Sequence, residues 1–140
     1  MFFFEYELAK VIELLEKFKV YAIYLFGSAV KNQLRNDSDI DIAFITDEDI
    51  DEYETFMKAQ ELAYVFKRNC DLIDLKKSST VFKMQVIGRG KAIYCTDEIK
   101  RAYFEMKSFK EYAILNEERA EVLKSIEKSG SIYDKRFSLQ

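Results

Sequence analysis

Two short apolar runs constrain the fold most strongly: one ends abruptly at a polar turn, and the other contains acidic residues that are unusual in a buried strand. The run "VYAIYLF" (20–26) is β-branched and aromatic, and it ends at the pair Gly27-Ser28. Ten residues later, Asp39 and Asp41 alternate with apolar residues in "DIDIAF". The first run predicts a strand that is covered on both faces. The alternation predicts a second strand, with both carboxylates on one of its faces.

Hydrophobic periodicity and turn residues predict the remaining elements. Helices are expected over 5–18, 27–34, 50–67 and 97–128. A further short helix is expected to be capped by Ser78 or Ser79 and to end near Gly88 and Gly90. Strands are expected at 70–75 and 91–95. This order predicts an α/β fold, with a domain over residues 1–96 and a C-terminal helical extension of the same domain over 97–140.

The composition narrows the chemistry that the chain can perform. The 140 residues include no histidine, so catalysis has to rest on carboxylates, hydroxyls or lysines. Acidic residues outnumber basic ones and the net charge is −3, which argues against direct nucleic-acid binding. Cys70 and Cys95 form no CxxC motif and are interpreted as small buried hydrophobic residues. No apolar run approaches the roughly 20 residues of a membrane span, and the N-terminus has no leader pattern, so we expect a cytoplasmic protein.

The turn Gly27-Ser28 lies where the first predicted strand gives way to a helix. Free backbone N–H groups at a helix N-terminus favour an anion such as phosphate, and glycine permits close approach of the backbone. Gly-Ser turns are also common as ordinary connections. The turn alone therefore leaves both interpretations open.

The pair Asp39 and Asp41 is the more specific feature. Two unit charges about 4 Å apart repel each other by roughly 4 kcal/mol at an effective dielectric constant of 20. A bound cation would offset this repulsion, and Mg²⁺ prefers carboxylate oxygens together with substrate phosphates. The alternative is a solvated edge strand with acidic residues on its outer face.

The next predicted strand, "CDLIDL", offers a third acid. Asp71 and Asp74 are three residues apart, so a regular strand directs them to opposite faces and only one can join the first two carboxylates. Three carboxylates beside a phosphate-binding turn would form a two-metal site for nucleotidyl transfer.

The combined motif "LFGS…SDIDIAF", followed by an acid on the next strand, resembles the DNA polymerase β-type nucleotidyltransferase superfamily. More narrowly it is similar to the minimal nucleotidyltransferases that act as antitoxins of HEPN-domain toxins. The resemblance covers about residues 5–100. It implies a polymerase β-like fold in which a small mixed sheet is flanked by helices and followed by a long C-terminal helical segment.

The resemblance also implies roles for individual residues. Gly27 and Ser28 would bind the triphosphate of ATP. Asp39 and Asp41 would bind Mg²⁺, with two ions expected. Asp71 would complete the catalytic and metal-binding set and activate the attacking hydroxyl, because the third acid of the family opens its strand.

Other positions depart from the family pattern or are left without a role. Members often carry Arg after the Gly-Ser pair and Gly four residues after the Ser, where this chain has Ala29 and Asn32. Asn tolerates a left-handed backbone better than most residues. Lys31 or Arg35 could then contact phosphate, or both could be solvated. Asp74 would be a capping or surface residue.

The C-terminal segment is rich in aromatic residues of the kind found at interfaces. These are Tyr103, Phe104, Phe109 and Tyr112. Packing against the domain itself is expected for the first half of the segment. For the second half, around 114–126, self-packing and a homo- or hetero-oligomeric contact are both open.

The leading hypothesis is transfer of NMP, with AMP from ATP favoured, onto a hydroxyl. In the family that this chain resembles, the acceptor is a tyrosine of the HEPN ribonuclease toxin, which is silenced by the modification. One alternative is a catalytically silent module that neutralises its partner by contact alone. Another is a nucleotidyltransferase that modifies a small molecule.

Overall fold

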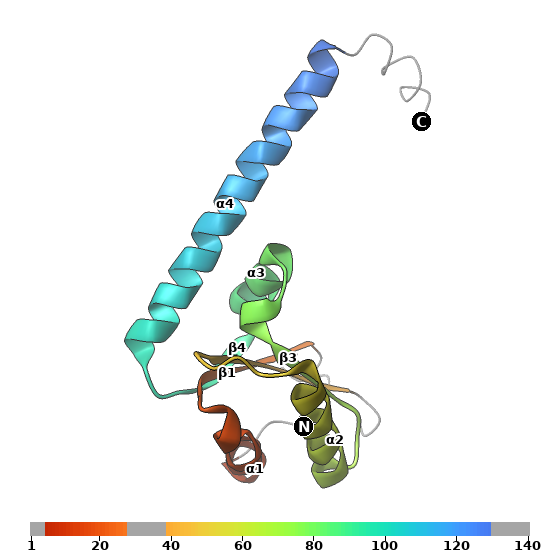
Figure 1. Cartoon of the computed structure of the whole chain (residues 1–140), viewed down its shortest axis with the longest axis vertical. Coiled ribbons are helices and arrows are strands. Elements are labelled where there is room, and N and C mark those ends of the chain that lie inside the picture. The colour runs from red at the N-terminus through yellow and green to blue at the C-terminus, as the bar shows by residue number, and fades with distance from the viewer. Residues whose placement is uncertain (1–4, 28–38, 130–140) are drawn as a thin grey trace.

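The computed structural model describes residues 5–27 and 39–129 as four helices, two 3-10 helices and four strands (Figure 1). The α-helices are α1 (Glu5–Leu15), α2 (Glu52–Phe66), α3 (Thr80–Arg89) and α4 (Glu98–Lys128). The 3-10 helices are η1 (Glu16–Phe18) and η3 (Leu75–Lys77). The strands are β1 (Val20–Phe26), β2 (Ile40–Thr46), β3 (Cys70–Asp74) and β4 (Lys91–Cys95).

The four strands form one mixed sheet in the order β3-β2-β1-β4. The central strand β1 pairs antiparallel with β2 and with β4, whereas β2 and β3 are parallel. The antiparallel register places Phe26 opposite Asp41, and the parallel register places Asp41 opposite Asp71. Three adjacent strands therefore meet at the edge where β1 ends and where β2 and β3 begin.

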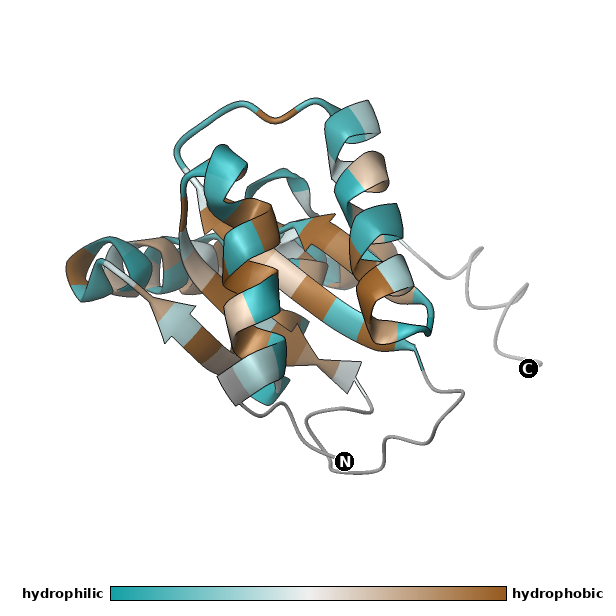
Figure 2. Ribbon diagram, turned by 90° about the horizontal axis from the view of Figure 1, so that it is seen from below, coloured by the Kyte–Doolittle hydropathy of each residue, from teal (hydrophilic) through white to brown (hydrophobic). Residues whose placement is uncertain are grey.

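Each face of the sheet has its own hydrophobic core. On one face, Ile42, Phe44 and Leu72 pack with residues of α1 and α2. On the other face, Tyr24 and Ile45 pack with residues of α3 and α4. Figure 2 shows the resulting pattern, in which the strands are predominantly hydrophobic and the helices carry both hydrophobic and hydrophilic residues. The alternation along β2 therefore directs Asp41 to the α3 face.

Helix α4 extends far beyond the sheet (Figure 1). The Asp97 side chain accepts a hydrogen bond from the Lys100 backbone N–H and caps its first turn. Phe104 packs on the sheet core and Ser108 is buried, whereas Val122 and Leu123 are exposed. No described helix combines the length and the apolar character of a membrane span.

The predicted elements are confirmed wherever the described residues cover them. The second helix starts at Glu52, because Asp51 is its N-cap and accepts a hydrogen bond from the Tyr53 N–H. Of the two serines proposed as the next cap, Ser79 caps α3. The helix predicted over 27–34 lies outside the described residues, except for Gly27.

Candidate active site

Gly27 leaves β1 in a conformation that only glycine adopts easily. Its φ angle is +75°, in the left-handed region. A Cβ atom at this position would lie 2.2 Å from Asp41 Oδ2, well inside the sum of the van der Waals radii. The glycine thus allows the chain to turn directly against the Asp41 carboxylate. Its partner in the predicted turn, Ser28, lies outside the described residues, as do Ala29, Lys31, Asn32 and Arg35.

Asp41 and Asp71 form a carboxylate pair across β2 and β3. The two residues are direct partners in the parallel register, so their side chains leave the same face of the sheet on neighbouring strands. Burial, the neighbouring Asp71 carboxyl and the negative charge of Asp39 raise the pKa of Asp41 to about 6. Without a cation, the Asp41 carboxyl therefore holds its proton to a higher pH than an ordinary aspartate does.

Asp39 contributes to the same site from a different position. It is exposed and immediately precedes β2, and its charge raises the pKa of Asp41 less than the neighbouring Asp71 carboxyl does. Repulsion within the Asp39–Asp41 pair, expected from the sequence, is therefore the smaller effect on the pKa of Asp41. The larger effect comes from Asp71 on the neighbouring strand, which a spacing along one strand cannot reveal.

Asp74 lies on the opposite face of the sheet from Asp71. It is 9% exposed, and neither carboxylate oxygen has a hydrogen-bond partner among the described residues. Burial raises its pKa, and the charges of Lys76 and Lys77 only partly offset this effect. Of the two predicted roles, the surface position was wrong, because the strand alternation turns Asp74 toward the core beside α2. Asp74 does occupy the N-cap position of η3, but its side chain makes no capping hydrogen bond. The expectation that only one of Asp71 and Asp74 lies near Asp41 is confirmed.

The end of the sheet where Asp39, Asp41 and Asp71 lie, which we call the carboxylate edge, suits a hard cation, although its side chains do not surround a metal ion on all sides. Within residues 5–27 and 39–129, no three acidic or thiol side chains converge as the ligands of one metal ion. Mg²⁺ is typically held by one or two carboxylates and completes its shell with substrate phosphates and water. The Asp41–Asp71 pair, with Asp39 at the strand entrance, meets that requirement, and the raised pKa of Asp41 marks where a cation would relieve the repulsion.

The cysteines take no part in this chemistry. Burial, with a smaller contribution from the charges of nearby acids including Asp71, raises the pKa of the Cys70 thiol to about 12, so it remains protonated and unreactive. Cys70 and Cys95 are both free, and Cys70 is buried as predicted, whereas Cys95 is half-buried.

One polar network near the site was not predicted from the sequence. The buried Tyr24 hydroxyl on β1 donates a hydrogen bond to Glu105 Oε2 on α4, and Arg101 Nη1 donates to the same oxygen at 3.2 Å. Because Tyr24 and Glu105 are 81 positions apart, no local pattern could have joined them. The network fixes the first part of α4 to the central strand.

Comparison with known proteins identifies the family. Residues 9–99 match the family described as "Polymerase beta, Nucleotidyltransferase". The chain belongs to this family. It is also 34% identical over 119 residues to the protein adenylyltransferase MntA of Shewanella oneidensis, and the match covers 84% of this chain and 85% of that protein.

Solved structures of toxin–antitoxin complexes match the same fold. One is a toxin–antitoxin crystal structure with AMP-PNP, at a TM-score of 0.73 and 36% identity, covering 84% of this chain and 96% of that chain. Another contains the tri-AMPylated HEPN toxin of Shewanella oneidensis with its MNT antitoxin, at a TM-score of 0.71 and 31% identity, covering 87% and 97%. The polymerase β-like fold predicted from the sequence is confirmed.

Proposed function

We propose that this chain is a Mg²⁺-dependent protein adenylyltransferase, which transfers AMP from ATP to a tyrosine hydroxyl of a HEPN-type toxin and thereby acts as its antitoxin. The observation that carries the proposal is the Asp41–Asp71 carboxylate pair, with Gly27 turning against it at one edge of the sheet. Similarity to a protein adenylyltransferase, and to the antitoxin in a complex with an AMPylated toxin, supports the protein acceptor.

The proposed reaction is a displacement at the α-phosphorus of ATP. The acceptor oxygen forms a bond to that phosphorus, the bond to the bridging oxygen of the β-phosphate breaks, and pyrophosphate leaves. Asp71 accepts the proton of the acceptor hydroxyl, for which it needs to be ionised. Asp71 is exposed at the start of β3, so an acceptor hydroxyl can approach its carboxylate.

Mg²⁺, when bound, would supply the positive charge that neutralises the phosphates and keeps the carboxylates ionised. Asp39, Asp41 and Asp71 are the residues that would hold it. The backbone of Gly27, together with Ser28, would contact the triphosphate, since a side chain at position 27 would displace Asp41. The proposal places the reaction in the cytoplasm, where ATP is available.

We further propose that the catalytic domain spans residues 1–96 and that 97–140 is its helical extension, which holds the toxin. The family match ends at residue 99, one residue after α4 begins at Glu98. Tyr103 and Phe109 are exposed by 63% and 61%, so large aromatic side chains are free to contact a partner.

The function is tested by incubating the protein with Mg²⁺, its cognate HEPN protein and ATP labelled at the α-phosphate. We expect the label to appear on the HEPN protein and to disappear when the acceptor tyrosine is replaced by Phe. A silent binding module would instead suppress the ribonuclease activity without labelling the protein. Label on a small molecule, with the HEPN protein unmodified, would instead indicate a nucleotidyltransferase that modifies small molecules.

A further inference from the structure

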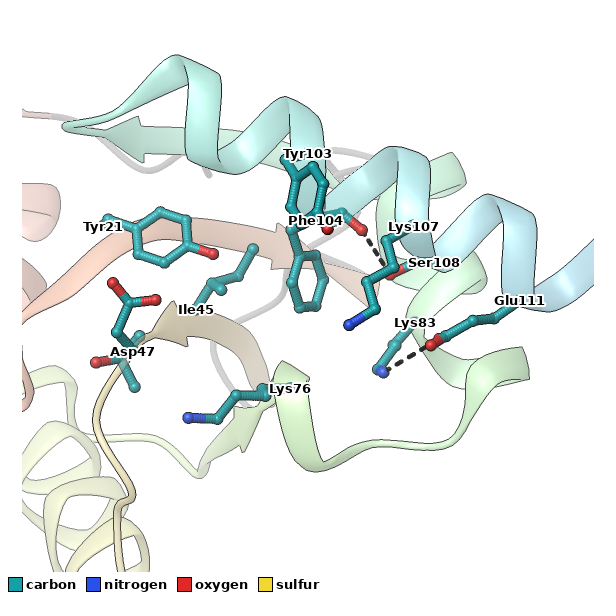
Figure 3. Close-up of a pocket in the computed structure, with 11 residues that line it drawn as sticks. Tyr21, Ile45, Asp47, Lys76, Lys83, Tyr103, Phe104, Lys107, Ser108 and Glu111 are labelled. Atoms are coloured by element: carbon teal, nitrogen blue, oxygen red, sulfur yellow. Dashed lines mark hydrogen bonds and ion pairs between the residues drawn. The ribbon is translucent and has the colours of Figure 1, made fainter.

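A cavity lies on the same face of the sheet as the carboxylates, at the opposite end of β2. Its volume is about 320 Å³, and it is enclosed by the end of β2, the segment from η3 into α3, and residues 103–111 of α4 (Figure 3). Ile45, which lines it, is four residues beyond Asp41 and thus about 13 Å away at about 3.3 Å per residue. Between them, Ala43 is fully buried, so the cavity is separate from the carboxylate edge.

The two acidic residues that line this cavity are already compensated. Asp47 forms an ion pair with Lys100. Glu111 forms an ion pair with Lys83, with 3.7 Å between Oε1 and Nζ. Neither acid therefore leaves an unbalanced negative charge in the cavity.

Two of the three lysines that line the cavity, Lys76 and Lys107, form no ion pair within the described residues, although the charge of Lys76 also acts on Asp74 and Asp49. Lys76 Nζ donates to the backbone oxygen of Glu48 at 2.7 Å, which orients the ammonium without neutralising it. Lys107 forms no ion pair within the described part of the chain. Figure 3 shows its amine pointing into the cavity beside the ring of Phe104. The lining thus holds three lysines and two acids, an excess of one positive charge.

Three aromatic rings also line the cavity. Tyr21 and Phe104 lie on two sides of the cavity, and Tyr103 extends the wall along α4 (Figure 3). Lys83 Nζ lies 5.7 Å from the centroid of the Phe104 ring, and this contact helps to hold the ring in place. Aromatic rings beside lysines are the combination that binds a base together with its phosphate.

We propose that this cavity is a second ligand site, which binds a nucleoside monophosphate such as AMP. A phosphate monoester carries a charge of about −1.5 to −2 at pH 7, which suits a lining in which lysines outnumber acids and in which Lys76 and Lys107 form no ion pair. The rings offer a stacking surface for the base, and the volume lies at the lower end of the range for small-ligand sites, about 300–1,000 Å³. The inference does not depend on the proposed reaction, because it rests on the lining residues alone.

The test measures AMP binding to the full-length protein by isothermal titration calorimetry. We expect the double variant Lys76→Gln/Lys107→Gln to bind AMP at least about tenfold more weakly, because two charge-assisted contacts are lost. Lys110→Gln is the control, since this exposed lysine of α4 does not line the cavity. The variant Asp39→Ala/Asp41→Ala separates the two sites and should bind AMP as tightly as the wild type. AMP binding that depends on the aspartates and not on the lysines would overturn the proposal.

Two further ligands test the chemistry of the site on the unmodified protein. Adenosine and inorganic phosphate should each bind at least about tenfold more weakly than AMP, because each lacks half of the contacts. Inorganic phosphate that binds as tightly as AMP would show that the rings do not contact a base and would overturn the assignment. Since this comparison uses no variant, it remains decisive if the lysine variant fails to fold.

Discussion

The carboxylate edge and helix α4 are built in opposite ways. The edge gathers Gly27, Asp41 and Asp71 from three strands, and a change at one of them alters the surroundings of the others. Helix α4 is one continuous element, and of all its residues Ser108 is the one that is fully buried. Its outer half, beyond Ser108, therefore contributes almost nothing to the core. A site assembled from three strands is suited to chemistry, and an exposed helix is suited to a partner. The two activities should therefore be separable by mutation.

The largest effect is expected from Asp39→Ala/Asp41→Ala. Transfer should fall by about 10³-fold or more, since the groups that stabilise the reacting phosphates are lost. Complex formation should persist, because α4 is unchanged. Stability without metal should hold or rise, because crowded carboxylates are removed. Labelled transfer, co-purification with the HEPN protein and thermal unfolding in EDTA measure the three quantities. A double variant that retains full transfer would end the catalytic interpretation.

A matched pair of substitutions in β3 tests the edge itself. Asp71→Asn should reduce transfer by about 10²-fold or more, the usual contribution of a general base. Asp74→Asn changes the same type of residue on the other face and should leave transfer within about twofold. Initial rates at saturating ATP make the comparison. If Asp74→Asn is the more damaging of the two, the buried carboxylate and not the exposed one serves the reaction.

Removing the outer part of α4 tests the other half of the comparison. Deleting residues from Lys110 onward should weaken the complex with the HEPN protein at least about 30-fold, the effect of one interface anchor worth about 2 kcal/mol. ATP affinity should stay within about twofold, since Gly27 and the carboxylates lie elsewhere. Calorimetric titration with each ligand provides both numbers. An unchanged complex would mean that the partner binds another surface.

The smallest effect is expected from Gly27→Ala. The left-handed backbone costs a non-glycine residue roughly 1–2 kcal/mol, and the new methyl group would press on the Asp41 carboxylate. Transfer should fall by about tenfold, together with a moderate loss of thermal stability. Gly88→Ala is the control, because a Cβ there meets no atom within 4 Å. If the two variants had equal transfer rates and equal thermal stability, the turn at Gly27 would not contribute to the site.

The sequence predicted the elements well because their signals are local. The alternation in β2, the Ser79 cap and the length of α4 each depend on residues close together in the chain. The site was predicted less completely, since the pairing of Asp41 with Asp71 depends on strand register. Asp74 was misplaced because its burial depends on α2 packing over β3. The link between Tyr24 and Glu105 has no local signal at all.

Titration of the Asp41 carboxyl carbon by NMR, with and without Mg²⁺, tests the central claim most directly. Without metal we expect a pKa of about 6. Because this value is above the ordinary 3.8, the group stabilises the metal-free fold at pH values below about 4, and that contribution is lost as the pH rises through 6. When Mg²⁺ and an unreactive ATP analogue are bound, the pKa should fall below about 4, since a cation favours the ionised form. An unchanged pKa near 6 would contradict a cation site at Asp41 and Asp71.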